Sequence, residues 1–170
     1  ADELDPRMFN GPLNERVLKL SDRVKAGLGT IPKIVGTGLD IYAGQIEAED
    51  GLQRIHDIYH PFHSAVLKHR NIIHDQFDFV LLIDCHSMPQ TGKNRGVLEN
   101  NTHADIVLGD RFGTSCAPHI SEWIEHRLQQ LGMNVARNTP YAGGHNTHIY
   151  ADPDRSFHTI QIEIARHLYM

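Results

Sequence analysis

The pattern of apolar and polar positions predicts strands along much of the chain. Residues 77–85, FDFVLLIDC, form a nearly continuous apolar run, which is typical of a central strand covered on both faces. Residues 104–108 and 134–138 predict two further short strands. Residues 159–165, TIQIEIA, alternate strictly and predict a strand with its polar side chains on one face. We expect Phe79–Ile83 to be an interior strand of a mixed sheet with helices on both faces.

Helical periodicity separates these runs. Residues 15–25 predict a short helix, and residues 48–71 predict a longer one that Pro61 interrupts. Residues 121–132 predict an amphipathic helix for which Gly132 is a suitable C-terminal cap. Because strands alternate with helices, the sequence predicts an α/β fold with three layers, αβα.

Composition and charge narrow the class of protein. The 170 residues fit one domain, and 40% of them are hydrophobic, which excludes a mostly disordered chain. The net charge is −5 and no basic stripe is visible, so we expect no nucleic-acid partner. The longest apolar run has five residues, 79–83, far fewer than the roughly 18 that a membrane span needs. Two cysteines without metal-binding spacing favour buried thiols in a reducing compartment, the cytoplasm.

Candidate chemistry begins where the apolar run ends in Asp84-Cys85-His86-Ser87. Ligands usually bind at the carboxyl ends of the strands in such sheets. A neutral imidazole at that edge is a good zinc ligand, and a neighbouring carboxylate could orient it. The alternative for His86 is a structural hydrogen bond to a loop.

Glu163 lies in the middle of a predicted strand, between two isoleucines. If its face lines a cavity, burial raises the pKa of the carboxyl, which suits a general base. The alternative, which the pattern alone favours, is that the polar face formed by Thr159, Gln161 and Glu163 is simply wet.

Residues 138–144, NTPYAGG, form a third candidate, since proline and paired glycines indicate a loop with an approachable backbone. Asn138 and Tyr141 offer neutral hydrogen bonds, and Arg111 and Arg137 could hold a carboxylate with two hydrogen bonds. An ordinary surface turn is the alternative. Weaker metal candidates are the histidine pairs His60 with His63 and His145 with His148.

Several segments together resemble the N-formylglutamate amidohydrolase family. In the order of the family they are AGLGTIPKIV, YHPFH, LLIDCHSMP, DIVLGDRFGTSC, NTPYAGG and QIEIARHLYM. The resemblance implies a carboxypeptidase-like αβα fold with a mixed, mostly parallel central sheet. It also implies a zinc-dependent amide hydrolase that releases formate and L-glutamate from N-formyl-L-glutamate, the last step of one histidine-degradation route.

The resemblance assigns roles to individual positions. His86 corresponds to a zinc ligand at the end of a strand, and Glu163 to the catalytic base. Arg111, Asn138 and Tyr141 are the candidates for binding the substrate carboxylates or the developing oxyanion. Family members carry two motifs before the matching region, Pro-His-Ser-Gly-like and Asp-x-Asn-Arg, that this sequence lacks.

We therefore expect residues 1–170 to be a single domain that is the C-terminal portion of a longer chain. The other zinc ligands and a substrate arginine are expected from the segment that carries the two missing motifs. On this interpretation the 170 residues alone bind zinc weakly or not at all, unless the four paired histidines complete the site.

Two other functions stay open at this point. One is a different zinc amidohydrolase of the same fold, aspartoacylase-like or peptidoglycan amidase-like. The other is a non-catalytic binding domain that has lost its metal ligands; the zinc content of the purified protein separates it from the enzymes. The expected partner is a small N-formyl amino acid, with no membrane partner, and the sequence does not set the oligomeric state.

Overall fold

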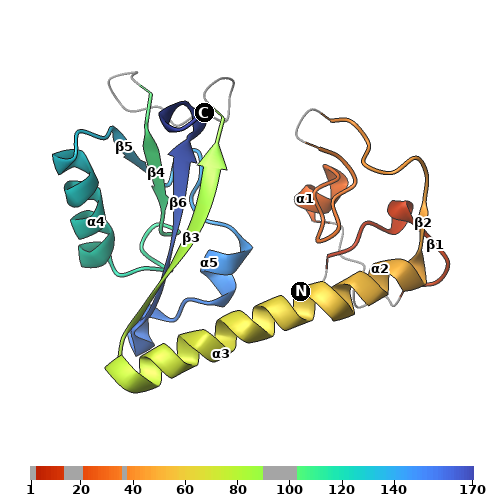
Figure 1. Ribbon diagram of the computed structural model, residues 1–170, viewed down its shortest axis with the longest axis horizontal. Coiled ribbons are helices and arrows are strands. Elements are labelled where there is room, and N and C mark those ends of the chain that lie inside the picture. The colour runs from red at the N-terminus through yellow and green to blue at the C-terminus, as the bar shows by residue number, and fades with distance from the viewer. Residues whose placement is uncertain (1–2, 14–20, 36–37, 90–102) are drawn as a thin grey trace. The chain divides into compact units, whose positions relative to one another are not determined.

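The computed structural model describes residues 3–13, 21–35, 38–89 and 103–170. The chain divides into two compact units, Ala1–Val66 and Leu67–Met170, and the division falls within helix α3 (His60–Phe77). Figure 1 gives the order of the elements in each unit. The single domain expected from the sequence stays a prediction.

The first unit is built around a short parallel pair of strands, β1 (Phe9–Asn10) and β2 (Ile46–Glu47). Helices α1 (Asp22–Lys25) and α2 (Ala48–Arg54) accompany it. A Cβ on Gly51 would overlap the ring of Phe9, so this glycine lets α2 pack directly on that ring. The buried core of the unit comprises Leu4, Met8, Phe9, Ile31, Ala48 and Ile55. Of the helix predicted over 15–25, residues 15–20 lie outside the described residues.

Pro61 does not end the predicted long helix. A π-helical turn, Ile55–Tyr59, joins α2 to α3, and Pro61 is the second residue of α3. Proline lacks the N–H that an α-helix would use, and its ring crowds the preceding turn. The wider π turn accommodates both effects at that point, so the helical segment continues to Phe77. In the described part of the chain, none of the helices is long and apolar enough to cross a membrane.

The second unit holds a four-stranded sheet in the order β3-β6-β4-β5. Strands β3 (Val80–Met88) and β6 (Phe157–Ala165) are parallel, as are β4 (Ile106–Gly109) and β5 (Val135–Arg137). The central pair β4 and β6 is antiparallel. The sheet is therefore mixed and mostly parallel, as the sequence predicts.

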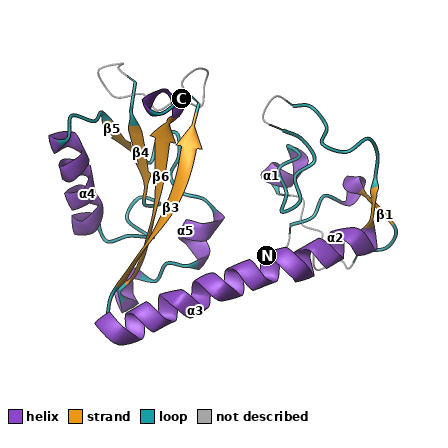
Figure 2. Ribbon diagram, viewed as in Figure 1, coloured by secondary structure: helices purple, strands orange, loops and turns teal. Residues whose placement is uncertain are grey.

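Helices lie on both faces of this sheet. Figure 2 shows α4 (Pro118–Gln130) along one face and α5 (His145–Ile149) beside the other. The face under α4 carries the core residues Ile106, Leu108, Cys116, Val135 and Ile160. The opposite face carries Met88, Ala104, Val107, Ala136 and Ala165, with Tyr141 packed against them. The arrangement is a three-layer αβα unit, as predicted.

The prediction that Phe79–Ile83 is an interior strand is wrong for the described residues. Strand β3 pairs only with β6 and forms an edge of the sheet, while β6 is paired on both sides. Phe79 is 43% exposed and Ile83 is 48% exposed. An apolar run indicates that both faces of a strand avoid water, but it does not say whether a strand lies on each side.

The polar face of β6 also differs from the simpler expectation. Thr159, Gln161 and Glu163 are 0%, 6% and 4% exposed, so the wet face that the pattern alone favours is wrong. Buried polar groups require partners. The buried carboxyl of Glu163 must therefore find its partners within the fold.

Candidate active site

The register of β3 and β6 brings the two main candidates together. Asp84 pairs with Gln161 and His86 pairs with Glu163 in this parallel ladder. Side chains two residues apart on a strand point to the same face, so the four form one polar cluster. His86 Nδ1 lies 3.9 Å from Glu163 Oε1. The two candidates, far apart in sequence, thus lie close together on neighbouring strands.

Glu163 is a buried carboxyl with one close amide partner. Gln161 Nε2 donates a hydrogen bond of 2.7 Å to Glu163 Oε1. Burial raises the pKa of Glu163 above its ordinary value, and the nearby His86 and the Gln161 hydrogen bond oppose that rise without cancelling it. A carboxyl with a raised pKa exchanges a proton more easily near neutral pH, which is what a general acid–base group requires.

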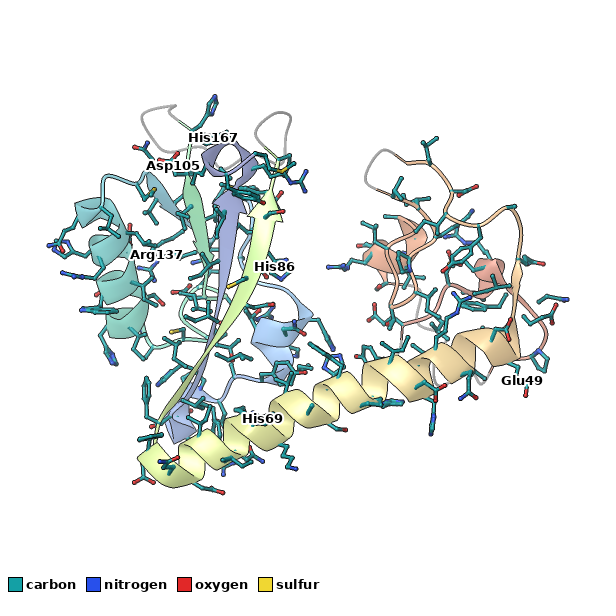
Figure 3. The ribbon with its side chains drawn as sticks, viewed as in Figure 1. Glu49, His69, His86, Asp105, Arg137 and His167 are labelled. Carbon is teal, nitrogen blue, oxygen red and sulfur yellow. The ribbon has the colours of Figure 1, made fainter. Side chains whose placement is uncertain are left out.

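His86 is the more accessible member of the cluster, and Figure 3 labels it on β3. Its side chain is 44% exposed, and its Nε2 lies 3.1 Å from Asp84 Oδ2. This carboxylate contact orients the ring, as carboxylates do for metal-binding and catalytic histidines. Asp84 is the orienting carboxylate that the sequence pattern suggests beside His86.

The described residues do not by themselves form a metal centre. No group of three or more His, Cys, Asp or Glu side chains within them could hold a metal ion. That result covers the histidine pairs as well as His86. A catalytic zinc needs three protein ligands, and the family resemblance assigns only His86 among the described residues.

The loop 138–144 covers the sheet on the Glu163 side. A Cβ on Gly109 would lie only 2.7 Å from Gly143 N and 2.9 Å from Tyr141 O, so the loop touches β4 through this glycine. Gly109 pairs with Gln161 in the antiparallel ladder and therefore shares its face. Burial and the Glu163 charge both raise the pKa of Tyr141, which places its ring near that carboxyl.

Gly109→Ala is expected to lift this loop from the sheet. The added methyl would meet backbone atoms, which cannot rotate away, and such overpacking costs about 1–3 kcal/mol. We expect urea denaturation to show that loss, and ligand affinity at the loop to fall with it. Gly44→Ala is the control, because a Cβ there meets nothing within 4 Å. Equal stability of the two variants would contradict the close packing of loop and strand.

Arg111 lies against the same loop. Its backbone N–H donates to Ala142 O at 2.7 Å, and its Cγ would be 3.0 Å from a Cβ on Gly143. Arg111 is half-buried, and its guanidinium has no hydrogen bond or ion pair with any described residue. A guanidinium without a partner can bind a carboxylate with two hydrogen bonds.

The side chains of Asn138 and Arg137 form hydrogen bonds within the protein. Asn138 Nδ2 donates to Asp110 Oδ1 at 2.8 Å, and its Oδ1 accepts from the N–H groups of Asp110 and Phe112. Arg137 Nη2 donates to Asp110 Oδ2 at 2.5 Å, and Figure 3 places Arg137 on the α4 side of the sheet. One N–H of Asn138 is left for a substrate, so its direct contact with substrate stays a prediction.

Gln161 and Asp110 are the two site residues that the sequence did not single out as functional. Gln161 belongs to three polar positions that the pattern alone places on a wet face, and Asp110 belongs to a loop motif. Each is buried against a charged group, and only the three-dimensional contacts reveal this.

Comparisons with known proteins identify the family of the chain. A profile of the N-formylglutamate amidohydrolase family matches residues 1–170. The chain belongs to this family. The family resemblance drawn from the sequence motifs is thereby confirmed.

Individual relatives agree with the family assignment. An N-formylglutamate deformylase from Pseudomonas putida is 28% identical over 123 residues, which cover 72% of this chain and 45% of the relative. The protein of that name from Pseudomonas aeruginosa is 26% identical over 148 residues, 85% of this chain and 54% of the relative. The crystal structure of N-formylglutamate amidohydrolase from Ralstonia eutropha superposes with a TM-score of 0.85 at 31% identity.

These relatives are longer than this chain. The superposition covers 99% of this chain and 60% of the Ralstonia protein. The chain spans about half the length of the two Pseudomonas relatives. The shared fold, a carboxypeptidase-like α/β fold, thus extends over nearly all of the chain.

Proposed function

We propose that this protein hydrolyses the formamide bond of N-formyl-L-glutamate to formate and L-glutamate. The observation that carries the proposal is the buried Glu163 beside His86, at 3.9 Å, in a chain of the amidohydrolase family. The reaction breaks a linear amide, and amide hydrolysis needs a base for the attacking water and an acid for the leaving amine. One carboxyl with a raised pKa can serve both steps in turn.

Glu163 is proposed to carry the proton. It accepts a proton from the water whose oxygen adds to the formyl carbon. It then delivers that proton to the amide nitrogen as the carbon–nitrogen bond breaks. Gln161 holds one carboxyl oxygen by its 2.7 Å hydrogen bond, which leaves the other oxygen for the water.

Substrate binding is proposed to depend on Arg111 and Tyr141. Glutamate bears two carboxylates, and a guanidinium without a partner is the group that recognises one of them most specifically. The Tyr141 hydroxyl can donate to the formyl oxygen as negative charge develops there. Both residues belong to the side of the sheet that bears Glu163.

We also propose a zinc ion with His86 as one ligand and its remaining ligands outside the described residues. When bound, zinc would polarise the formyl oxygen and make the water more acidic. The proposal rests on the family resemblance and on the accessible, carboxylate-oriented ring of His86. Metal analysis of the purified protein and of His86→Ala tests it, and a stoichiometric zinc that His86→Ala retains would contradict it.

The same activity would place the protein at the last step of a histidine-degradation route, in the cytoplasm. The substrate class rests on the names of the relatives and on the cationic Arg111. An aspartoacylase-like enzyme would bind an N-acyl aspartate instead, and a peptidoglycan amidase would bind a muropeptide.

Formate release tests the proposed function directly. N-Formyl-L-glutamate, N-formyl-L-glutamine, N-acetyl-L-aspartate and a muropeptide are compared as substrates of the protein. Release of the free amine is measured for all four, because the last two contain no formyl group. We expect turnover of N-formyl-L-glutamate to exceed that of the others. Preferred cleavage of either of the last two would identify the rival enzymes, and binding without cleavage of any would identify a binding domain.

A further inference from the structure

A cluster of polar side chains lies beside Arg111, directly after the end of β4. Its centre is Asp110, which is 0% exposed. The Asp110 carboxylate accepts hydrogen bonds from Arg137 Nη2, Asn138 Nδ2 and the Gly113 N–H. A buried carboxylate is costly unless it is paired and hydrogen-bonded in this way. The cluster is therefore a built feature of the fold, and the proposed proton transfer does not use it.

The cluster fixes an unusual backbone conformation. Arg111, Phe112 and Asn138 have φ values of 52°, 56° and 58°, in the left-handed region that residues other than glycine rarely adopt. Asn138 Oδ1 accepts from the N–H groups on either side of Arg111, those of Asp110 and Phe112. Each left-handed residue costs free energy and persists only where its surroundings enforce it. Here the amide of Asn138 enforces it.

This backbone conformation sets the direction of the Arg111 side chain. Strand β4 ends at Gly109, and Asp110 then lies on the α4 side, where its partner Arg137 is 3.8 Å from Glu125 of α4. The backbone N–H of Arg111 instead bonds Ala142 O of the loop 138–144. A Cβ on Gly143 would lie 3.0 Å from Arg111 Cγ, and a Cβ on Gly144 would lie 3.5 Å from Gln161 Oε1, so Arg111 and Gln161 both lie close to this pair of glycines. Gln161 in turn donates to Glu163. Arg111 is therefore linked to the proposed base, Glu163, through the loop glycines and Gln161.

We propose that Asp110 and Asn138 are positioning residues that hold Arg111 ready to bind a carboxylate of the substrate. This inference rests on the proposed function for the identity of the substrate. It assigns Asn138 a role different from direct substrate contact. It also gives the buried Asp110 carboxylate a role, which is to hold the backbone of Arg111 in place. The Arg111 guanidinium has no partner among the described residues and stays available for the substrate.

The variant Asn138→Gly tests the inference, because glycine adopts the left-handed conformation without strain. Only the amide is lost. We expect KM for N-formyl-L-glutamate to rise about tenfold with kcat within about twofold, as for loss of a binding interaction made equally in ground and transition states. In the background Arg111→Met, the same substitution is expected to change KM little, because the positioned group is already absent.

Asn134→Gly is the matched control. Asn134 Nδ2 donates to Asp105 Oδ2 at 3.0 Å, an amide–carboxylate bond of the same kind at the other end of β5. We expect it to leave KM unchanged. A KM that rises equally in both variants, or that rises equally with and without Arg111, would assign Asn138 a structural role only and overturn the inference.

Calorimetric binding of glutarate, a dicarboxylate without an amide, separates this inference from the proposed function. Weaker glutarate binding by Asn138→Gly in a protein that releases no formate would support the inference and contradict the proposed reaction. Formate release by the wild-type protein together with unchanged KM and glutarate affinity in Asn138→Gly would support the proposed reaction and contradict the inference. Neither release nor binding in the wild-type protein would overturn both.

Discussion

Glu163→Gln is expected to reduce formate release from N-formyl-L-glutamate about a thousandfold, the scale of effect for removing a general base. The amide cannot accept the proton of the attacking water or return it to the leaving nitrogen. Glutamine has the shape of glutamate, and its Oε1 can still accept the hydrogen bond from Gln161 Nε2, now 2.7 Å to the carboxyl. The fold should therefore persist. Formate release under saturating substrate gives the measurement.

Glu122→Gln provides the control for this loss, because it makes the same chemical change on the exposed surface of α4. We expect that control to retain wild-type turnover. Glutarate affinity should be the same in Glu163→Gln and in the wild-type protein, which shows that the binding residues are in place. Turnover above about a tenth of the wild-type value in Glu163→Gln would exclude it as the base.

The fold could be predicted from the sequence to the extent that periodicity reports burial. The strict alternation of residues 159–165 identified β6 and placed Gln161 and Glu163 on one face. Alternation does not report which face is dry, and for that reason the buried polar face was missed. Residues 80–83 of the apolar run lie in β3, but the pairing partner of β3 is distant in sequence, so its position at the edge could not be predicted.

In the candidate site too, the sequence indicates single residues but not the contacts between distant ones. His86 and Glu163 could be selected as candidates because each is a chemically distinctive residue at a recognisable place on a strand. Their adjacency depends on the parallel register of β3 and β6, which no local pattern specifies. Asp110 is different, since its importance comes from contacts with Arg137 and Asn138, about 28 positions along the chain. Polar residues in a loop motif do not reveal in sequence which of them are buried together.

Arg137→Met is expected to lower the free energy of unfolding by about 3 kcal/mol at neutral pH, because it leaves a buried carboxylate without its cation. Burial on its own would raise the pKa of Asp110. Hydrogen bonds from Asn138, Arg137 and the Gly113 N–H outweigh burial, so the pKa lies below its ordinary value. The wild-type stabilisation is therefore fully present above the unfolded pKa of about 3.9 and is lost as pH falls through the lower folded value.

In Arg137→Met, the contribution of Asp110 to stability depends on pH in the opposite direction. Without the guanidinium, burial dominates, and the pKa of Asp110 rises above its unfolded value. Protonation then removes the unpaired charge as pH falls from about 7 to 4, so the deficit of Arg137→Met should be largest at neutral pH and shrink in acid. Arg127→Met makes the same change at an exposed site, where the only hydrogen-bond partner of the guanidinium among the described residues is Gln130, at 2.9 Å. It should cost at most about 0.5 kcal/mol. Urea denaturation of both variants at several pH values provides the measurement. A deficit in Arg137→Met that is small, or that is the same at every pH, would show that Asp110 does not carry a buried charge held by Arg137.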